Sequence, residues 1–258
     1  MIGALAAIEA WLVFDHKAQW KKWLSYLDTI ASRVSGIDSI KTSVQEPTGL
    51  SNNSPVLVIS WDPSRLHITG EELSEELGRN KPRIAFSFGR RRNSTDESGL
   101  TSINITAGQM QPGEDKIVAD RLYGALSQKR TPKPTAMDAP AGVVSGRWNV
   151  NVEFYSSKSL FTWVLEQDGN WLRGIHNGTF SMQNIAGTIE GNQVKIRSAE
   201  SLPGDHIAFT YTGTLSQDTL SGSIYMVEYG TARFTAQRYK YPEGHMPIAV
   251  PGGPPLAT

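Results

Sequence analysis

The spacing of apolar and polar residues changes along this chain. Up to about residue 128, segments with helical spacing alternate with short apolar runs typical of strands. From about 143 to 240, every apolar segment is short, alternates with polar residues and ends at a turn sequence. The stretch between them, KRTPKPTAMDAPAG at 129–142, is polar and rich in proline. This pattern predicts two domains, 1–128 and 143–240, joined by a proline-rich linker.

The first half is predicted to be an α+β small domain. Apolar residues recur at helical spacing through 2–34, which predicts one long helix. Its first turns are apolar nearly all round, so we expect them to be buried against a partner segment. Thr69 and Glu72 form a capping-box pattern at the start of a second helix. The remaining elements are strands at 40–45, 56–61, 83–88 and 102–106 and helices at 71–77 and 112–126, which together give a small sheet with covering helices.

The second half is predicted to be an eight-stranded antiparallel up-and-down β-barrel. Short turn sequences such as QDGN and EGNQ separate its strands, so strands adjacent in sequence should pair. Closure of the sheet into a barrel removes exposed edges. The strands are expected at 145–155, 159–167, 170–177, 179–189, 193–199, 205–216, 219–228 and 231–239. The Pro/Gly-rich tail, 241–258, is expected to be extended or disordered.

The predicted barrel interior carries candidate ligand contacts. Alternation places Trp148 of the first strand and Arg238 of the last strand on the inner face, as a cation–π contact requires. An eight-stranded barrel is either filled by its own side chains or holds one small ligand. The simpler interpretation is that the inner aromatic residues only form the core. The other candidate lining residues are Trp163, Phe209, Tyr211, Ile224, Met226 and Phe234.

The amino-acid composition argues against several classes of function. The chain has 25 basic and 25 acidic residues, which argues against a broad surface for nucleic acid. It has no cysteine, which excludes thiolate catalysis and cysteine-ligated zinc. The five histidines are scattered, none pairs with another at metal-ligand spacing, and no metal site is predicted. The apolar segment 2–14 lacks the features of a signal peptide, and it is too short, with Glu9 inside it, for a membrane span. The compartment is therefore undetermined, with the cytoplasm as the default.

The first half also resembles a known enzyme family. MIGALAAIEAWL, DHKAQWKKW and INITAGQMQPGEDKIVADRLYGAL are similar to the carboxy-terminal small domain of fold-type-I pyridoxal-phosphate (PLP) enzymes. The branch is that of selenocysteine synthase and D-glucosaminate-6-phosphate ammonia-lyase-like proteins. The resemblance implies lyase or transferase chemistry on amino acids and, for the complete protein, a homo-oligomer. In that family the cofactor lysine lies upstream on a large domain, and no lysine here has a matching context, so PLP is not expected to be bound by this chain alone.

The same resemblance implies one substrate contact, Arg83 in KPRI. In related enzymes, an arginine at this place in the small domain holds a substrate carboxylate or phosphate with two hydrogen bonds. The alternative is an ordinary solvated arginine at the end of a strand.

The second half resembles lipocalin-like (calycin) barrels. The resemblance rests on Gly146-Arg147-Trp148 near the start and Arg238 at the end, where such barrels close one mouth with a tryptophan under an arginine. It implies the fold and no chemistry.

The sequence thus supports two principal hypotheses. In the first, the chain is the carboxy-terminal part of a PLP-dependent lyase or transferase, whose cofactor domain lies upstream or on a partner chain. In the second, it is a non-catalytic module whose barrel binds a small apolar ligand or mediates assembly. The need to cover the apolar start of the first helix favours the first hypothesis.

Overall fold

The computed structural model describes residues 2–47, 54–88, 99–134, 136–178, 182–198 and 209–241. The chain divides into two compact units, with the main boundary after Asp138. The first unit also takes in Ser223–Ala232, and the second includes Ala139–Ala199 and Thr212–Gly222. The first unit holds helices and a small sheet, and most of the barrel belongs to the second.

The predicted long helix is in fact two helices, α1 (Ile2–Val13) and α2 (His16–Val34). The prediction of one continuous helix over 2–34 is wrong because Asp15 interrupts it. The Asp15 backbone leaves the helical region, and its carboxylate accepts a hydrogen bond from the Ala18 N–H at 2.9 Å. Such an N-cap satisfies a donor that a new helix would otherwise leave unpaired, so it favours a helix start at this point.

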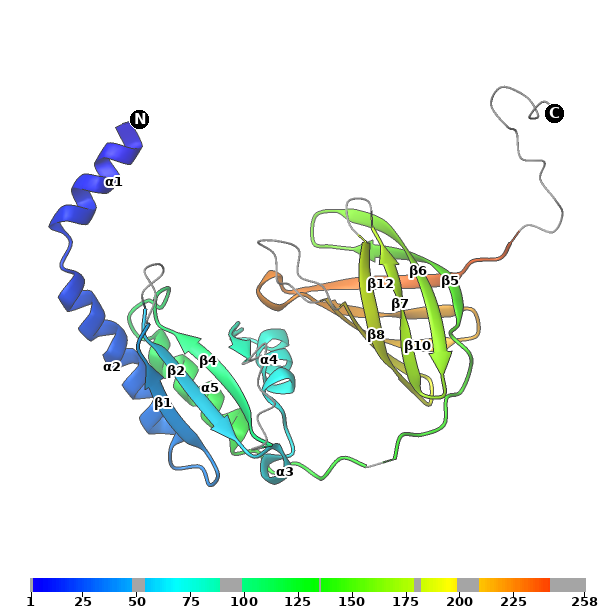
Figure 1. Ribbon diagram of the computed structural model, residues 1–258, viewed down its shortest axis with the longest axis horizontal. Helices are drawn as coiled ribbons and strands as arrows, with labels where there is room; N and C mark the ends of the chain where they lie inside the picture. Colours follow the sequence, from blue (N-terminus) through cyan, green and yellow to red (C-terminus); the bar gives the residue numbers. More distant parts are fainter. Residues whose placement is uncertain are drawn as a thin grey trace, which may run out of the picture. The chain divides into compact units, whose positions relative to one another are not determined.

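The apolar helix α1 is exposed along its length. Trp11 is 67% exposed and Val13 is 85% exposed, and the other described side chains of α1 are also exposed. Figure 1 shows α1 extending away from the sheet and from α5 of the same unit. No described residue of this chain covers α1, so its burial against a partner segment stays a prediction. Glu9 is the only charged residue of α1, so this helix presents apolar groups on all sides.

The sheet of the first unit has three main strands and a short fourth. β1 (Lys41–Gln45), β2 (Val56–Trp61) and β4 (Thr101–Thr106) pair antiparallel, and the two-residue β3 (Ser87–Phe88) lies beside β4. The strand predicted over 83–88 is regular only at its end. The Ile84 N–H donates instead to the Leu77 carbonyl at the end of a helix, so it is not available to a strand ladder.

Three further helices complete this unit. α3 (Pro63–Leu66) was not predicted, although Asp62 followed by proline is a helix-start signal. α4 (Gly70–Arg79) begins with the predicted capping box, in which the Thr69 hydroxyl and the Glu72 carboxylate each accept from the other residue's N–H. α5 (Glu114–Leu126) starts two residues after Pro112, because Gly113 adopts a φ of +91° at the N-cap.

The core of the first unit lies where α2 and α5 pack together and against β2 (Figure 1). Alternate residues of β2 face this core, which explains its burial pattern. The fully buried residues of this core include Leu27, Ile30, Leu57, Ile59, Trp61, Ile103 and Leu122. After α5, the chain stays attached to α4, because Arg130 pairs with Glu76 at 2.9 Å and Lys133 pairs with Glu72.

The eight-stranded up-and-down barrel is confirmed (Figure 1). Each strand neighbours the next in sequence, and the last strand pairs with the first to close the sheet. The strands are β5 (Gly146–Glu153), β6 (Lys158–Asp168), β7 (Trp171–Asn177), β8 (Met182–Glu190), β9 (Gln193–Ser198), β10 (Thr210–Ser216), β11 (Thr219–Tyr225) and β12 (Thr231–Arg238).

In the barrel, the described strand bounds lie within about two residues of the prediction except at the end of β11. β11 ends at Tyr225 rather than continuing to residue 228, because a 3-10 turn, η1 (Val227–Tyr229), follows it. The predicted strand starts at 179 and 205, and the predicted tail beyond 241, lie outside the described residues.

Candidate functional site

One end of the barrel is closed by the predicted tryptophan–arginine pair. Trp148 is 0% exposed, and the Arg238 guanidinium carbon lies 4.4 Å from the centre of its indole ring. The two residues are opposite each other in the β5–β12 pairing. The Trp148 Nε1–H donates to the Val144 carbonyl at 2.8 Å, so the indole is both packed and hydrogen-bonded. The predicted cation–π contact is confirmed.

The donors of Arg238 are used by the protein itself. Nε donates to Asp218 Oδ1 at 2.9 Å, Nη1 donates to the Ser145 carbonyl at 2.6 Å, and Nη2 donates to the Val143 carbonyl. These bonds tie the segment before β5 and the β10–β11 turn to the last strand. This end of the barrel is a structural closure rather than an entrance for a ligand.

The other predicted lining residues lie in or beside the barrel interior. Trp163 packs against Phe234 with ring centroids 5.6 Å apart. Phe209 is half-buried just before β10, and Met226 is buried just after the end of β11. Buried strand residues of the set are Trp163, Tyr211, Ile224 and Phe234. Aromatic packing of this kind fits a filled core, and ligand contact by these side chains stays a prediction.

A buried histidine, His176, was missed by the sequence analysis. It is 3% exposed on β7, and its Nδ1 accepts a hydrogen bond from the Trp163 Nε1–H at 3.1 Å. Burial lowers the pKa of His176 to about 4, so the imidazole is neutral near pH 7. The sequence could have predicted this burial, because side chains alternate between the two faces of a strand. Counting from the buried Leu172, residue 176 is on the inner face.

Because His176 is buried and neutral, the barrel should lose stability in acid. The folded pKa, about 4, lies below the ordinary value of 6.5, so the unfolded chain binds more protons between these values. Stability is therefore complete above about pH 6.5 and falls as pH drops toward 4. We expect calorimetry to show this slope for the wild-type barrel. His176→Asn keeps an acceptor for Trp163 but does not titrate, so its slope should be flatter, and equal slopes would contradict the prediction.

Arg83, the predicted substrate contact, lies within the first unit and binds backbone carbonyls. Its Nε donates to the Gly78 carbonyl at 2.9 Å, and its Nη2 donates to the carbonyls of Val227 and Glu228 at 3.2 and 3.1 Å. Only Nη1 lacks an acceptor among the described residues. Arg83 thus holds the end of α4 to η1, and its role toward a substrate stays a prediction.

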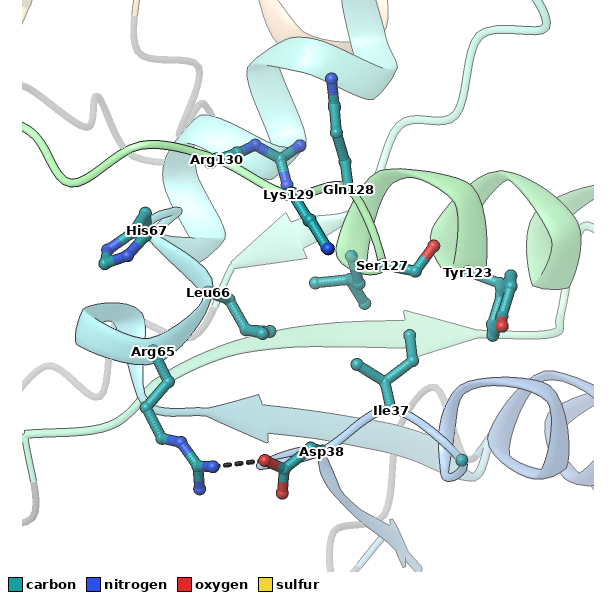
Figure 2. A pocket seen from close by; sticks show the side chains of 12 residues that line it. Ile37, Asp38, Arg65, Leu66, His67, Tyr123, Ser127, Gln128, Lys129 and Arg130 are labelled. Atoms are coloured by element: carbon teal, nitrogen blue, oxygen red, sulfur yellow. Dashed lines mark hydrogen bonds and ion pairs between the residues drawn. The ribbon is translucent and has the colours of Figure 1, made fainter.

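The first unit also contains a hollow of about 560 Å³ where α2, α3 and α5 end (Figure 2). Its volume is in the range of small-molecule sites. Ile37, Leu66 and Leu126 give it an apolar floor, and a paired Arg65 and Asp38 lie at one side. The remaining lining residues are Gly36, His67, Tyr123, Ser127, Gln128, Lys129 and Arg130.

The charges around this hollow are largely balanced. Arg130 is paired with Glu76 and also donates to the Ala125 carbonyl, which caps the end of α5. Figure 2 shows the Lys129 ammonium reaching toward the hollow, whereas Gln128 extends the opposite way. Cations at a helix end also complement the helix dipole. The described lining of the hollow therefore has no cluster of titrating groups suited to acid–base chemistry.

No group of three metal-ligating side chains occurs among the described residues. Within the same residues, no helix has the length and apolar character needed to cross a membrane. Comparison with known protein families finds no match, and no curated protein matches the chain.

Proposed function

We propose that this chain is the carboxy-terminal part of a PLP-dependent lyase or transferase, with the barrel as an appended module. In this proposal, the sheet β1-β2-β4-β3 with α2, α4 and α5 is the small domain, and the reaction is elimination or replacement at an amino acid. Support comes from the similarity of residues 1–128 to such small domains.

The observation that carries the proposal is the exposure of α1. A helix that is apolar on all sides is normally enclosed by other protein, because exposed apolar surface is unfavourable in water. A second copy of α1 would cover only one stripe of it. A surrounding groove on another domain would cover it all, and we propose that the cofactor domain supplies this groove.

The residues of this chain do not fit PLP. A lysine that holds the cofactor needs a desolvated setting and a phosphate cradle beside it. Every lysine of the chain lies on the surface. We therefore propose that PLP is held by the large domain, upstream in a longer protein or on a partner chain. Arg83 Nη1 is the atom we propose to contact the substrate.

Purification of the native protein under mild conditions, followed by borohydride treatment, tests the proposal. Borohydride fixes PLP covalently to the lysine that holds it, and peptide mapping then locates that lysine. We expect the modified lysine to lie outside residues 1–258. A native complex free of PLP, with a chain mass of 28.3 kDa, would contradict the proposal.

Introducing a charged side chain on α1 should weaken the binding of this chain to the proposed cofactor domain. We expect Leu5→Glu to weaken the association about 100-fold or more, because it places an unpaired charge in an apolar groove. Glu9→Gln on the same helix is the control and should bind as the wild type does. The measurement is the dissociation constant for the separately purified cofactor domain, and equal constants for Leu5→Glu and the wild type would show that α1 is not the contact.

A further inference from the structure

The outer face of the barrel is apolar on one side only. Side chains alternate between the two faces of a strand, and positions that face water are normally polar. The outward positions of β5, β9, β10, β11 and β12 follow this rule. Every large apolar side chain exposed on a described barrel strand instead belongs to β6, β7 or β8. These residues, here named the outer strip, are Leu160, Val164, Trp171, Ile175 and Met182.

The centre of the outer strip is a pair of β-branched residues. Val164 of β6 lies directly opposite Ile175 of β7, and both side chains are exposed. Residues opposite each other on one face of a sheet are close enough for their side chains to touch. Met182 of β8 is diagonally next to Ile175, because it pairs with Asn177, two residues further along β7. Exposed apolar side chains grouped in this way are typical of a surface that contacts another molecule.

Polar pairs lie on both sides of this centre, on the same two strands. On one side, Glu166 of β6 is opposite Arg173 of β7, and the Arg173 Nε donates to Glu166 Oε2 at 2.7 Å. Both side chains are largely exposed. On the other side, Thr162 of β6 is opposite Asn177 of β7. One strand thus carries an acid, an apolar residue and a hydroxyl, and its neighbour carries a base, an apolar residue and an amide.

This arrangement is complementary to itself. A two-fold axis that runs along the strands, between β6 and β7, places a second barrel face to face with the first. Each residue of β6 then faces the residue of β7 in the second copy that corresponds to its own neighbour. Glu166 faces Arg173, and Val164 faces Ile175. Because packed sheets cross at about 30°, the match is closest near the axis. Acid therefore meets base and apolar meets apolar, which a surface without this register would not achieve.

We propose that the outer strip binds a second copy of this chain about this two-fold axis. The barrel is closed, so its strands offer no free edge, and a partner must lie against a face rather than extend the sheet. Two convex barrels touch over a small area, so the interface belongs to the weak class, which buries less than about 1,200 Å² in total. The inference is independent of the proposed PLP function, because all residues of the outer strip belong to the second unit.

Sedimentation velocity of the full chain over about 5–500 µM covers the range in which a weak dimer forms. Every chain carries Leu5→Glu, which opposes self-association through the exposed helix α1. We expect a concentration-dependent equilibrium between monomer and dimer. Arg173→Glu should weaken the dimer at least about 10-fold, because like charges then face each other on both sides of the axis.

Arg233→Glu is the matched control for Arg173→Glu. Arg233 is an exposed residue of β12, outside the outer strip, and its substitution makes the same change in net charge. The dissociation constant should therefore stay at the value of the unsubstituted barrel. Ile175→Lys tests the apolar centre and should weaken the dimer at least about 10-fold, because it buries a charge without a partner. Circular dichroism checks that each barrel is folded.

A reciprocal charge swap tests the facing geometry itself. Glu166→Arg should weaken the dimer as Arg173→Glu does. The double variant, Glu166→Arg with Arg173→Glu, should return the dissociation constant to within about 3-fold of the starting value, because acid again faces base. This recovery is expected only if the two residues meet across the interface.

Three results would overturn the proposal. The first is a chain that stays monomeric up to the highest concentration. The second is a dimer that Arg173→Glu and Ile175→Lys leave intact, because another surface then makes the contact. The third is a double variant as weak as its two single variants, which would be incompatible with the two-fold arrangement.

Discussion

Trp148→Ala is expected to destabilise the barrel by about 3–5 kcal/mol, the usual cost of truncating a fully buried tryptophan. Trp148 is 0% exposed, lies under the Arg238 guanidinium and donates to the Val144 carbonyl. Alanine removes the packing, the cation–π contact and this hydrogen bond together. It also leaves a cavity at the closed end that the surrounding strands cannot fill without breaking their ladders.

Urea unfolding followed by circular dichroism measures this loss. Trp171→Ala is the matched control, because Trp171 belongs to the same barrel but is 63% exposed. Its substitution should change the unfolding free energy by about 0.5 kcal/mol or less. Similar losses for the two variants would show that Trp148 does not hold the closed end together.

Gly187→Val is expected to be almost as damaging, with a loss of about 3 kcal/mol. A Cβ atom at Gly187 would lie 2.0 Å from the Lys195 carbonyl oxygen on β9. That oxygen belongs to the backbone of a paired strand, so it can move only if the β8–β9 ladder is distorted. The close approach is a consequence of strong coiling of the sheet, which glycine permits.

The control for this variant is Ala186→Val, at the preceding exposed position of β8. Because its side chain points away from the barrel, it should leave the urea midpoint nearly unchanged. A wild-type midpoint for Gly187→Val would mean that β8 and β9 separate easily, contrary to the close approach of their backbones at this glycine.

The barrel could be predicted from the sequence because its strands alternate regularly and its turns are short. The same alternation predicts that Trp148 and Arg238 share the inner face, where they are in contact. The first unit was harder to predict. Apolar spacing runs through Asp15 without a break, and only the capping bond to Ala18 divides the helix. The segment after Arg83 is apolar enough for a strand, but Ile84 bonds to the end of α4 instead.

The buried polar residue His176 was missed for a related reason. Polar residues such as His176 and Gln183 look like irregularities in an alternating pattern, and only the register of β7 and β8 places them opposite each other. For Arg83, the sequence indicated the residue but not its three carbonyl partners, two of which are more than 140 residues away.

The pairing of β12 with β5 also matters during synthesis. Until Arg238 has left the ribosome, β5 has no partner on one side, and the nascent sheet has two open edges. An open strand edge can pair with a strand of another chain. The pairing of β12 with β5 joins distant parts of the chain, and such contacts form slowly. Cells that make this protein therefore face a period in which nearly all of the barrel has been translated but cannot close. Co-expression of a chaperone that covers strand edges should therefore raise the yield of folded protein more than slower translation alone would.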